Sequence, residues 1–176
     1  TLHRATVLSG LVRLLDIGFF RVGSERYAAE NRTFGLTTLL REHATVRRDG
    51  TIVFDYIAKH GKRRVQSVGE PELGELVGRL KRRRLDPDPR LFASRDAAGD
   101  WRHVRATDLN GYLQDATGAD ITAKDFRTWN GTVLAATLLA GTELPISKTA
   151  RNRATAGVVR QVADARGNTP AVARRP

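Results

Sequence analysis

Residues 44–68 read ATVRRDGTIVFDYIAKHGKRRVQSV, and the hydrophobic pattern of this stretch decides the fold class. Apolar and polar residues alternate along it, and many of the apolar ones are β-branched or aromatic, which is typical of β-strands. The dipeptides Asp49-Gly50 and His60-Gly61 favour tight turns. The stretch therefore predicts three short antiparallel strands, near residues 44–48, 51–58 and 63–68.

The sequence on both sides of this stretch has helical periodicity. Apolar residues three and four positions apart predict helices over 3–18, over 25–30 with Ser24 as N-cap, and onward from Pro71. Further helices are predicted after a cap at Thr107, from Thr122 to near Gly141, and over SKTARNRATAGVVRQVADARG. The predicted fold is therefore mainly α with a small three-stranded antiparallel β-sheet (α+β), in one domain over residues 1–176.

The composition points to a polyanionic partner. The chain has 30 Lys and Arg residues against 19 Asp and Glu, a formal net charge of +11, and the basic residues occur in clusters. The absence of cysteine excludes disulfides, thiolate metal sites and cysteine nucleophiles. The four histidines lack the paired spacing of metal ligands, no signal peptide is visible, and no apolar run approaches the ~18 residues of a membrane span. We therefore expect a cytoplasmic protein without a membrane partner, metal or other cofactor.

Four polar residues lie where surface solvation does not explain them. They are Arg21 after the first predicted helix, Lys59 at a hairpin turn, Arg127 in a helix of small and apolar residues, and Asn168 after a glycine. An unpaired buried guanidinium is costly, so Arg127 is expected to face an anion. Metal-free phosphodiester transfer needs groups of these kinds. Arginine forks stabilise charge on non-bridging oxygens, and a lysine can protonate a leaving oxygen.

Longer motifs around these residues resemble one family. RLLDIGFFRVGSERYAAENRTFGLTTL resembles the opening of the catalytic domain of type IB DNA topoisomerases, of the compact bacterial and poxviral kind. FDYIAKHGKRR is similar to their lysine-bearing hairpin, AKDFRTWNGTVLAA to their second-arginine helix, and GNTPAVARR to the segment before their active-site tyrosine. The resemblance implies relaxation of double-stranded DNA through a 3′-phosphotyrosyl intermediate, without ATP or metal, by a monomer associated with a bacterial nucleoid.

The resemblance also implies roles for individual residues. It assigns Arg21 and Arg127 to the scissile phosphate and Lys59 to protonation of the leaving 5′ oxygen. Asn168 stands where many relatives have histidine, and its amide can donate to a non-bridging oxygen without carrying charge. Tyr27 matches a position that touches the DNA major groove. Further DNA contacts are expected from Arg26, His60, Lys62, Lys124, Lys148 and Arg151.

Two parts of the family's pattern have no counterpart in this sequence. The nucleophilic tyrosine is expected just after NTPAVARR, whereas the chain's tyrosines are Tyr27, Tyr56 and Tyr112. From the resemblance we also expect the family's N-terminal β-rich domain and the segment after residue 176 to lie outside this sequence. We therefore expect the 176-residue chain to bind DNA without forming a covalent adduct.

Two other functions remain open at this point. A tyrosine recombinase shares the fold and catalytic residues, although KDFRTW fits the topoisomerase form better. A non-catalytic DNA-binding module would explain the missing tyrosine and Asn168.

The remaining expectations concern packing. Trp129, Leu134 and Leu138 are expected in the core, as are Phe19 and Phe20. The basic run of residues 81–84 is expected to form a solvated helix end, where it suits the helix dipole.

Overall fold

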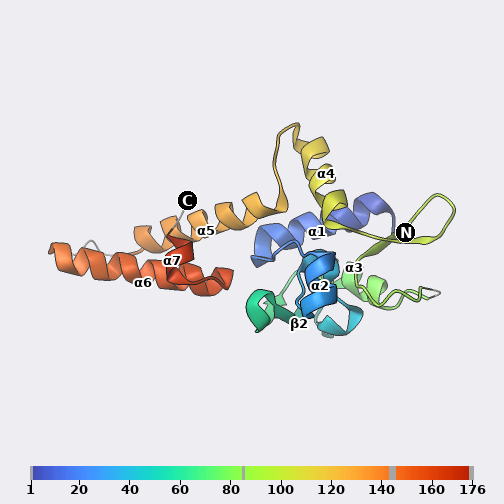
Figure 1. Cartoon of the computed structure of the whole chain (residues 1–176), viewed down its shortest axis with the longest axis horizontal. Helices are drawn as coiled ribbons and strands as arrows, with labels where there is room; N and C mark the ends of the chain where they lie inside the picture. The colour runs from blue at the N-terminus through green and yellow to red at the C-terminus, as the bar shows by residue number, and fades with distance from the viewer. Residues whose placement is uncertain (1, 85, 143–145, 175–176) are drawn as a thin grey trace. The chain divides into compact units, whose positions relative to one another are not determined.

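The structure, a computed structural model, describes residues 2–84, 86–142 and 146–174 (Figure 1). Within these ranges the chain is mainly helical with a three-stranded antiparallel sheet, so the predicted fold class is confirmed. The chain divides into two compact units, residues 1–124 and 125–176. The prediction of a single catalytic domain stays a prediction. The helices are α1 (Arg4–Gly18), α2 (Glu25–Asn31), α3 (Pro71–Lys81), α4 (Ala106–Thr117), α5 (Ala123–Ala140), α6 (Lys148–Arg166) and α7 (Pro170–Ala173).

The sheet of the first unit has the order β1-β2-β3, with β1 (Ala44–Val46), β2 (Ile52–Ala58) and β3 (Lys62–Val68). The register pairs Ile52 with Val68 and Ala58 with Lys62, so the second hairpin turn is only three residues long. His60 and Gly61 both have positive φ in that turn, which the predicted turn signal at these positions requires. Alternate β2 residues, namely Ile52, Phe54 and Tyr56, are buried, which confirms the period-two reading of this stretch.

The core of the first unit forms where α1 meets the sheet, α3 and α4. Its α1 face consists of fully buried residues at helical spacing, including Val7, Leu11 and Leu14. Phe20 is fully buried and meets Phe54 edge to face, with ring centroids 5.1 Å apart. The prediction for Phe20 is therefore confirmed. Phe19 is only half-buried, because it ends α1 in the left-handed conformation with φ 49°.

Two local predictions were wrong. A second hairpin, β4 (Ala93–Arg95) with β5 (Trp101–His103), was missed, because strands of three residues are too short for alternation to show. The N-cap of α4 is Arg105 rather than Thr107. The carboxylate of Asp108 accepts a hydrogen bond from the backbone N–H of Arg105 at 2.8 Å, which satisfies the helix start.

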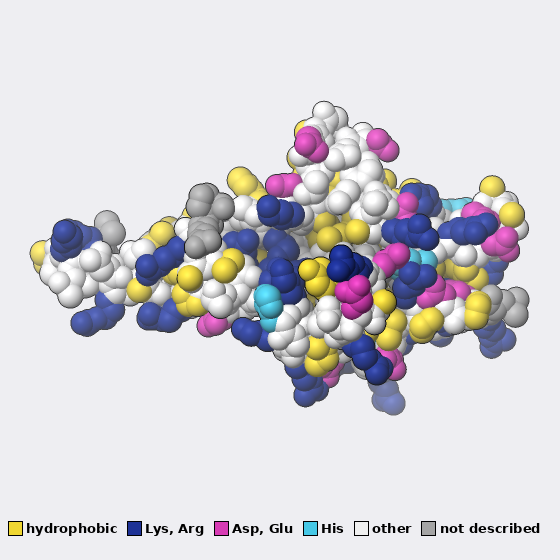
Figure 2. All heavy atoms as spheres, in the orientation of Figure 1, with side chains coloured by type: hydrophobic (Ala, Val, Ile, Leu, Met, Phe, Trp, Pro, Cys, Tyr) yellow, Lys and Arg dark blue, Asp and Glu magenta, His cyan; other side chains and the backbone are white. Residues whose placement is uncertain are grey.

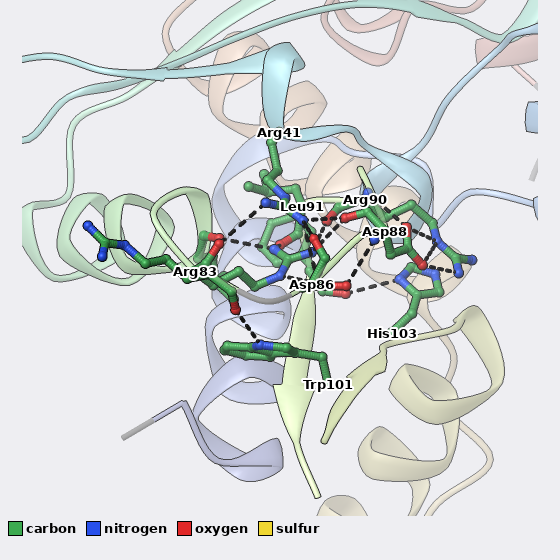
Figure 3. Close-up of polar contacts among 11 residues, drawn as sticks. Arg41, Arg83, Asp86, Asp88, Arg90, Leu91, Trp101 and His103 are labelled. Atoms are coloured by element: carbon green, nitrogen blue, oxygen red, sulfur yellow. Dashed lines mark hydrogen bonds and ion pairs between the residues drawn. The ribbon is translucent and has the colours of Figure 1, made fainter. Parts of the chain in front are cut away.

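The basic run at the end of α3 is not uniformly solvated, so that prediction was also wrong (Figure 3). Arg82 and Arg84 are exposed, whereas the Arg83 side chain is only 1% exposed. Arg83 donates to the carbonyl oxygens of Leu80 at 3.0 Å and Leu91 at 2.6 Å, and also to those of Asp88 and Arg90. It also forms an ion pair with Asp86. Arg83 therefore fixes the loop that follows α3 instead of extending into solvent.

The second unit contains most of α5 together with α6 and α7. The backbone of α5 lies close to α6 at Gly131, where an added Cβ would be 2.9 Å from Cδ of Arg166. Trp129 lies two residues away and so about 200° around the helix. Trp129 is accordingly 67% exposed, and Leu134 and Leu138 are half-buried, so the prediction of a core position is wrong for Trp129.

Candidate functional site

Arg21 is held where two backbone segments cross. Its carbonyl oxygen accepts from the N–H of Leu36 at 2.7 Å, and the carbonyl of Val22 accepts from Thr37 at 2.8 Å. Glycines allow this approach, because a Cβ on Gly35 would lie 2.5 Å from the backbone nitrogen of Gly23. The glycines of RVG and FG therefore determine the backbone position of Arg21.

Lys59 begins the short turn between β2 and β3. The N–H of Phe34 donates to the carbonyl of Ile57 at 2.8 Å, which brings the segment after α2 to the end of β2. A hollow of about 140 Å³ lies at this junction, lined by Arg21, Gly23, Ser24, Tyr27, Thr33, Phe34 and Lys59. The structure therefore brings Arg21, Tyr27 and Lys59 together from three separate segments of the first unit.

Tyr27 is the accessible tyrosine of this hollow. Its side chain is 55% exposed, whereas Tyr56 is 4% exposed and stacks on Phe20 with ring centroids 6.4 Å apart. Tyr112 is half-buried on α4. The hollow therefore offers a cationic lysine, a guanidinium and a phenol to a ligand that approaches from solvent.

Arg127 and Asn168 both belong to the second unit, and Arg127 contacts Arg166, two residues before Asn168. Arg127 is 6% exposed, and its Nη2 donates to the carbonyl oxygen of Arg166 at 2.7 Å. That carbonyl lies in the last turn of α6, the negative end of the helix dipole. Gly167 then ends the helix with φ 60°, and the N–H of Asn168 donates back to Ala163 at 2.8 Å. The Arg127 guanidinium therefore has a carbonyl acceptor within the second unit, and its expected contact with a phosphate stays a prediction.

The other predicted DNA contacts are exposed on several elements. Arg26 lies on α2 and pairs with Glu30 at 3.0 Å, while His60 lies within the β2–β3 turn and Lys62 begins β3. Lys124 is on the first turn of α5, and Lys148 and Arg151 are on the first turn of α6. Figure 2 shows Lys and Arg side chains at many places on the visible face, in keeping with the net charge of +11. The roles of these residues stay predictions.

Sequence reasoning missed a charged cluster beside α2. Glu25 Oε1 lies 3.4 Å from Nη1 of Arg90, 3.5 Å from Nε of Arg105 and 3.7 Å from Nε2 of His103. A hydrogen bond from Arg90 lowers the pKa of the neighbouring Asp88 to about 2. Burial, with Arg90 adding to it, lowers the pKa of His103. No sequence signal could have found this cluster, because its members lie far apart in the chain.

Two classes of site are not seen in the described part of the chain. No group of three or more histidine, aspartate and glutamate side chains there could hold a metal ion. None of the helices in those residues combines the length and the apolar character needed to cross a membrane.

Comparison with known proteins gives a consistent result over nearly the whole chain. Residues 2–175 match the family model described as eukaryotic DNA topoisomerase I, catalytic core. The chain is 30% identical over 131 residues to the protein named DNA topoisomerase 1B of Acanthamoeba polyphaga mimivirus, which covers 72% of this chain and 38% of that protein. It is 30% identical over 118 residues to DNA topoisomerase 1 of Candidozyma auris, which covers 66% of this chain and 14% of that one. The chain thus spans well under two thirds of the length of these curated relatives.

Proposed function

Because this chain belongs to the type IB DNA topoisomerases, we propose that it supplies the catalytic residues with which such an enzyme relaxes supercoiled double-stranded DNA. The match to the topoisomerase family model over residues 2–175 favours a topoisomerase over the alternative of a tyrosine recombinase. The two relatives come from a giant virus and a yeast, so the expected bacterial origin has no support from them. A monomer that acts at the nucleoid stays a prediction.

The proposed reaction consists of two transesterifications. A tyrosine hydroxyl attacks the phosphorus of one DNA strand, forms a 3′-phosphotyrosyl bond and releases the 5′ oxygen, which takes up a proton. The cut strand rotates about the intact one. The 5′ hydroxyl then gives up its proton and attacks the phosphorus of the phosphotyrosyl link, which reseals the strand and releases the tyrosine oxygen to take up a proton. Each step exchanges one phosphodiester for another, so ATP is not required for its energy.

The hollow of the first unit is the observation that carries this proposal. Arg21 and Lys59 come from separate elements and yet line the same small space. A guanidinium fork stabilises the charge that grows on non-bridging oxygens, and the exposed lysine can deliver a proton to the leaving 5′ oxygen. Tyr27 projects from the same hollow and is proposed to contact the DNA beside the scissile phosphate.

The family resemblance, and not the placement of the two units, is the basis for proposing that Arg127 and Asn168 bind non-bridging oxygens of the scissile phosphate. The contact from Arg127 to the end of α6 holds its side chain in one orientation. A guanidinium that is already oriented before the DNA binds stabilises the transition state more effectively. Asn168 donates through a neutral amide, so its contribution is expected to be smaller than that of a charged group.

Strand cleavage by point variants tests these roles. The protein tested is the chain extended past residue 176 by a segment that carries a tyrosine, and the substrates are supercoiled plasmid and a labelled duplex. Lys59→Ala and Arg127→Ala should each lower the cleavage rate by about 10²–10⁴-fold with little change in DNA affinity. Arg84→Ala, which removes an exposed charge, is the matched control. Equal losses in all three variants would refute the assigned roles.

Adduct formation by the 176-residue chain tests the expected separation of binding from cleavage. The 176-residue chain should bind the duplex and leave no covalent adduct on a denaturing gel, whereas the chain extended by a segment with a tyrosine should form one. If the chain alone forms the adduct, Tyr27→Phe decides whether the accessible tyrosine of the hollow is the nucleophile. Binding without an adduct or relaxation by either protein would indicate a non-catalytic DNA-binding module.

A further inference from the structure

The α2 helix carries two of the proposed DNA contacts, Arg26 and Tyr27, yet it has little packing of its own. None of its seven residues, Glu25–Asn31, is buried, and the side chain of its N-cap Ser24 makes no capping hydrogen bond. Isolated helices of this length are marginal in water. Some other interaction must therefore determine the orientation of α2.

Backbone contacts hold only the two ends of the segment that contains α2. The crossing at Gly23 and Gly35 holds the residues before α2, and the hydrogen bond from Phe34 to Ile57 holds the residues after it. The helix itself lies between two hollows. One is the hollow with Lys59, and the other has about 220 Å³ and is lined by Glu25, Ala28, Ala29, Phe34, Thr38, Leu40 and Arg90. Packing therefore leaves the rotation and tilt of α2 weakly determined.

Glu25 supplies the missing constraint. Its carboxylate lies between Arg90 and Arg105, at 3.4 and 3.5 Å, with His103 3.7 Å away. Burial lowers the pKa of His103 and its Nδ1 donates to the carbonyl oxygen of Phe92 at 3.1 Å, so the neutral ring is a neighbour of Glu25 and not an ion-pair partner (Figure 3 shows Arg90 and His103). These three residues lie at or beside the second hairpin, far from α2 in the sequence. The cluster therefore links α2 to the second hairpin and to the loop after α3.

The geometry points to Glu25 as the positioning residue for Tyr27. We infer that its ion pairs with Arg90 and Arg105 set the rotation of α2, and so hold Tyr27 toward the hollow of Arg21 and Lys59. Residues two apart on a helix lie about 200° apart, so fixing the Glu25 side directs Tyr27 to the opposite side. This inference rests on the proposed function, because it concerns how the same hollow receives DNA.

Glu30 gives a matched control on the same helix. Its carboxylate pairs with Arg26 within α2, at 3.0 Å. Glu25→Gln and Glu30→Gln each remove one negative charge close to the hollow, so long-range attraction of DNA should rise equally in both. Only Glu25→Gln also removes a link between α2 and another element.

The test measures the affinity of the 176-residue chain for a labelled duplex, in the wild type and in a Tyr27→Ala background. Glu30→Gln should bind as tightly as wild type or more tightly. Glu25→Gln should bind about three- to tenfold more weakly, the range expected for loss of exposed ion pairs. In the Tyr27→Ala background, Glu25→Gln should cause no loss and should bind like Glu30→Gln, because the residue that Glu25 positions is gone and only the change in charge remains.

Each other outcome overturns the inference in a distinguishable way. Equal affinities for Glu25→Gln and Glu30→Gln, or a loss that persists without Tyr27, would show that Glu25 does not act through Tyr27. A lowered midpoint of thermal unfolding in Glu25→Gln would show a structural role instead. Failure of the wild type itself to bind duplex DNA would refute the proposed function, and the inference with it.

Discussion

Replacing Arg83 with alanine is expected to destabilise the first unit more than any surface change nearby. The Arg83 side chain is 1% exposed, and its partner Asp86 is 5% exposed. Removing one member of a buried ion pair typically costs about 3–5 kcal/mol, because the remaining charge is left without compensation. Arg41 lies 3.6 Å from Asp86 and compensates in part, so the lower end, about 3 kcal/mol, is expected.

Loss of the hydrogen bonds of Arg83 is expected to destabilise the first unit further. The guanidinium donates to main-chain carbonyls of α3 and of the loop that follows it, and alanine leaves those oxygens without this donor. For a chain of this size, a loss of about 3 kcal/mol lowers the midpoint of thermal unfolding by about 6–12 °C. Arg83→Lys keeps the charge but not the planar fork, so an intermediate loss is expected.

Tryptophan fluorescence provides the assay. Trp101 lies 5.6 Å from the Arg83 guanidinium and reports on the first unit, whereas Trp129 belongs to the second. All proteins should therefore carry Trp129→Phe, and unfolding should be followed in urea. Arg84→Ala removes the same charge from an exposed neighbour and should change the free energy of unfolding by less than about 0.5 kcal/mol. Similar losses for Arg83→Ala and Arg84→Ala would refute the structural role of Arg83.

Three further outcomes are expected. Gly35→Ala should lower both stability and DNA cleavage, since its Cβ would meet the Gly23 backbone at 2.5 Å, and urea unfolding together with the cleavage assay checks this. The folded-state pKa of Asp88 is lowered to about 2 from 3.8, so its contribution to stability is present above about pH 4 and is lost as the pH falls toward 2. Acid titration followed by circular dichroism should show a shallower loss over that interval in Arg90→Gln. DNA affinity should fall steeply with salt, because phosphate contacts release counterions, and an affinity independent of ionic strength would contradict a DNA partner.

Elements with local signals could be predicted from the amino-acid sequence alone. The alternation over residues 44–68 and the turn dipeptides located the sheet, and helical spacing located α1, α3 and α6. Motifs around Arg21, Lys59 and Arg127 identified the family, which the comparison with known proteins confirms. Such signals are readable because periodicity, turn chemistry and short motifs depend only on neighbouring residues.

The burial and the partners of individual charged side chains depend on the tertiary structure. Arg83 and Arg84 are adjacent basic residues after one helix, yet only Arg83 is buried, because loop carbonyls and Asp86 surround it. Arg127 donates a hydrogen bond to the end of α6, and Glu25 pairs with Arg90 and Arg105. Both contacts join residues that are far apart in the chain. The partner of a charged side chain depends on where the fold brings distant segments together, and that placement is not encoded in the residues next to it.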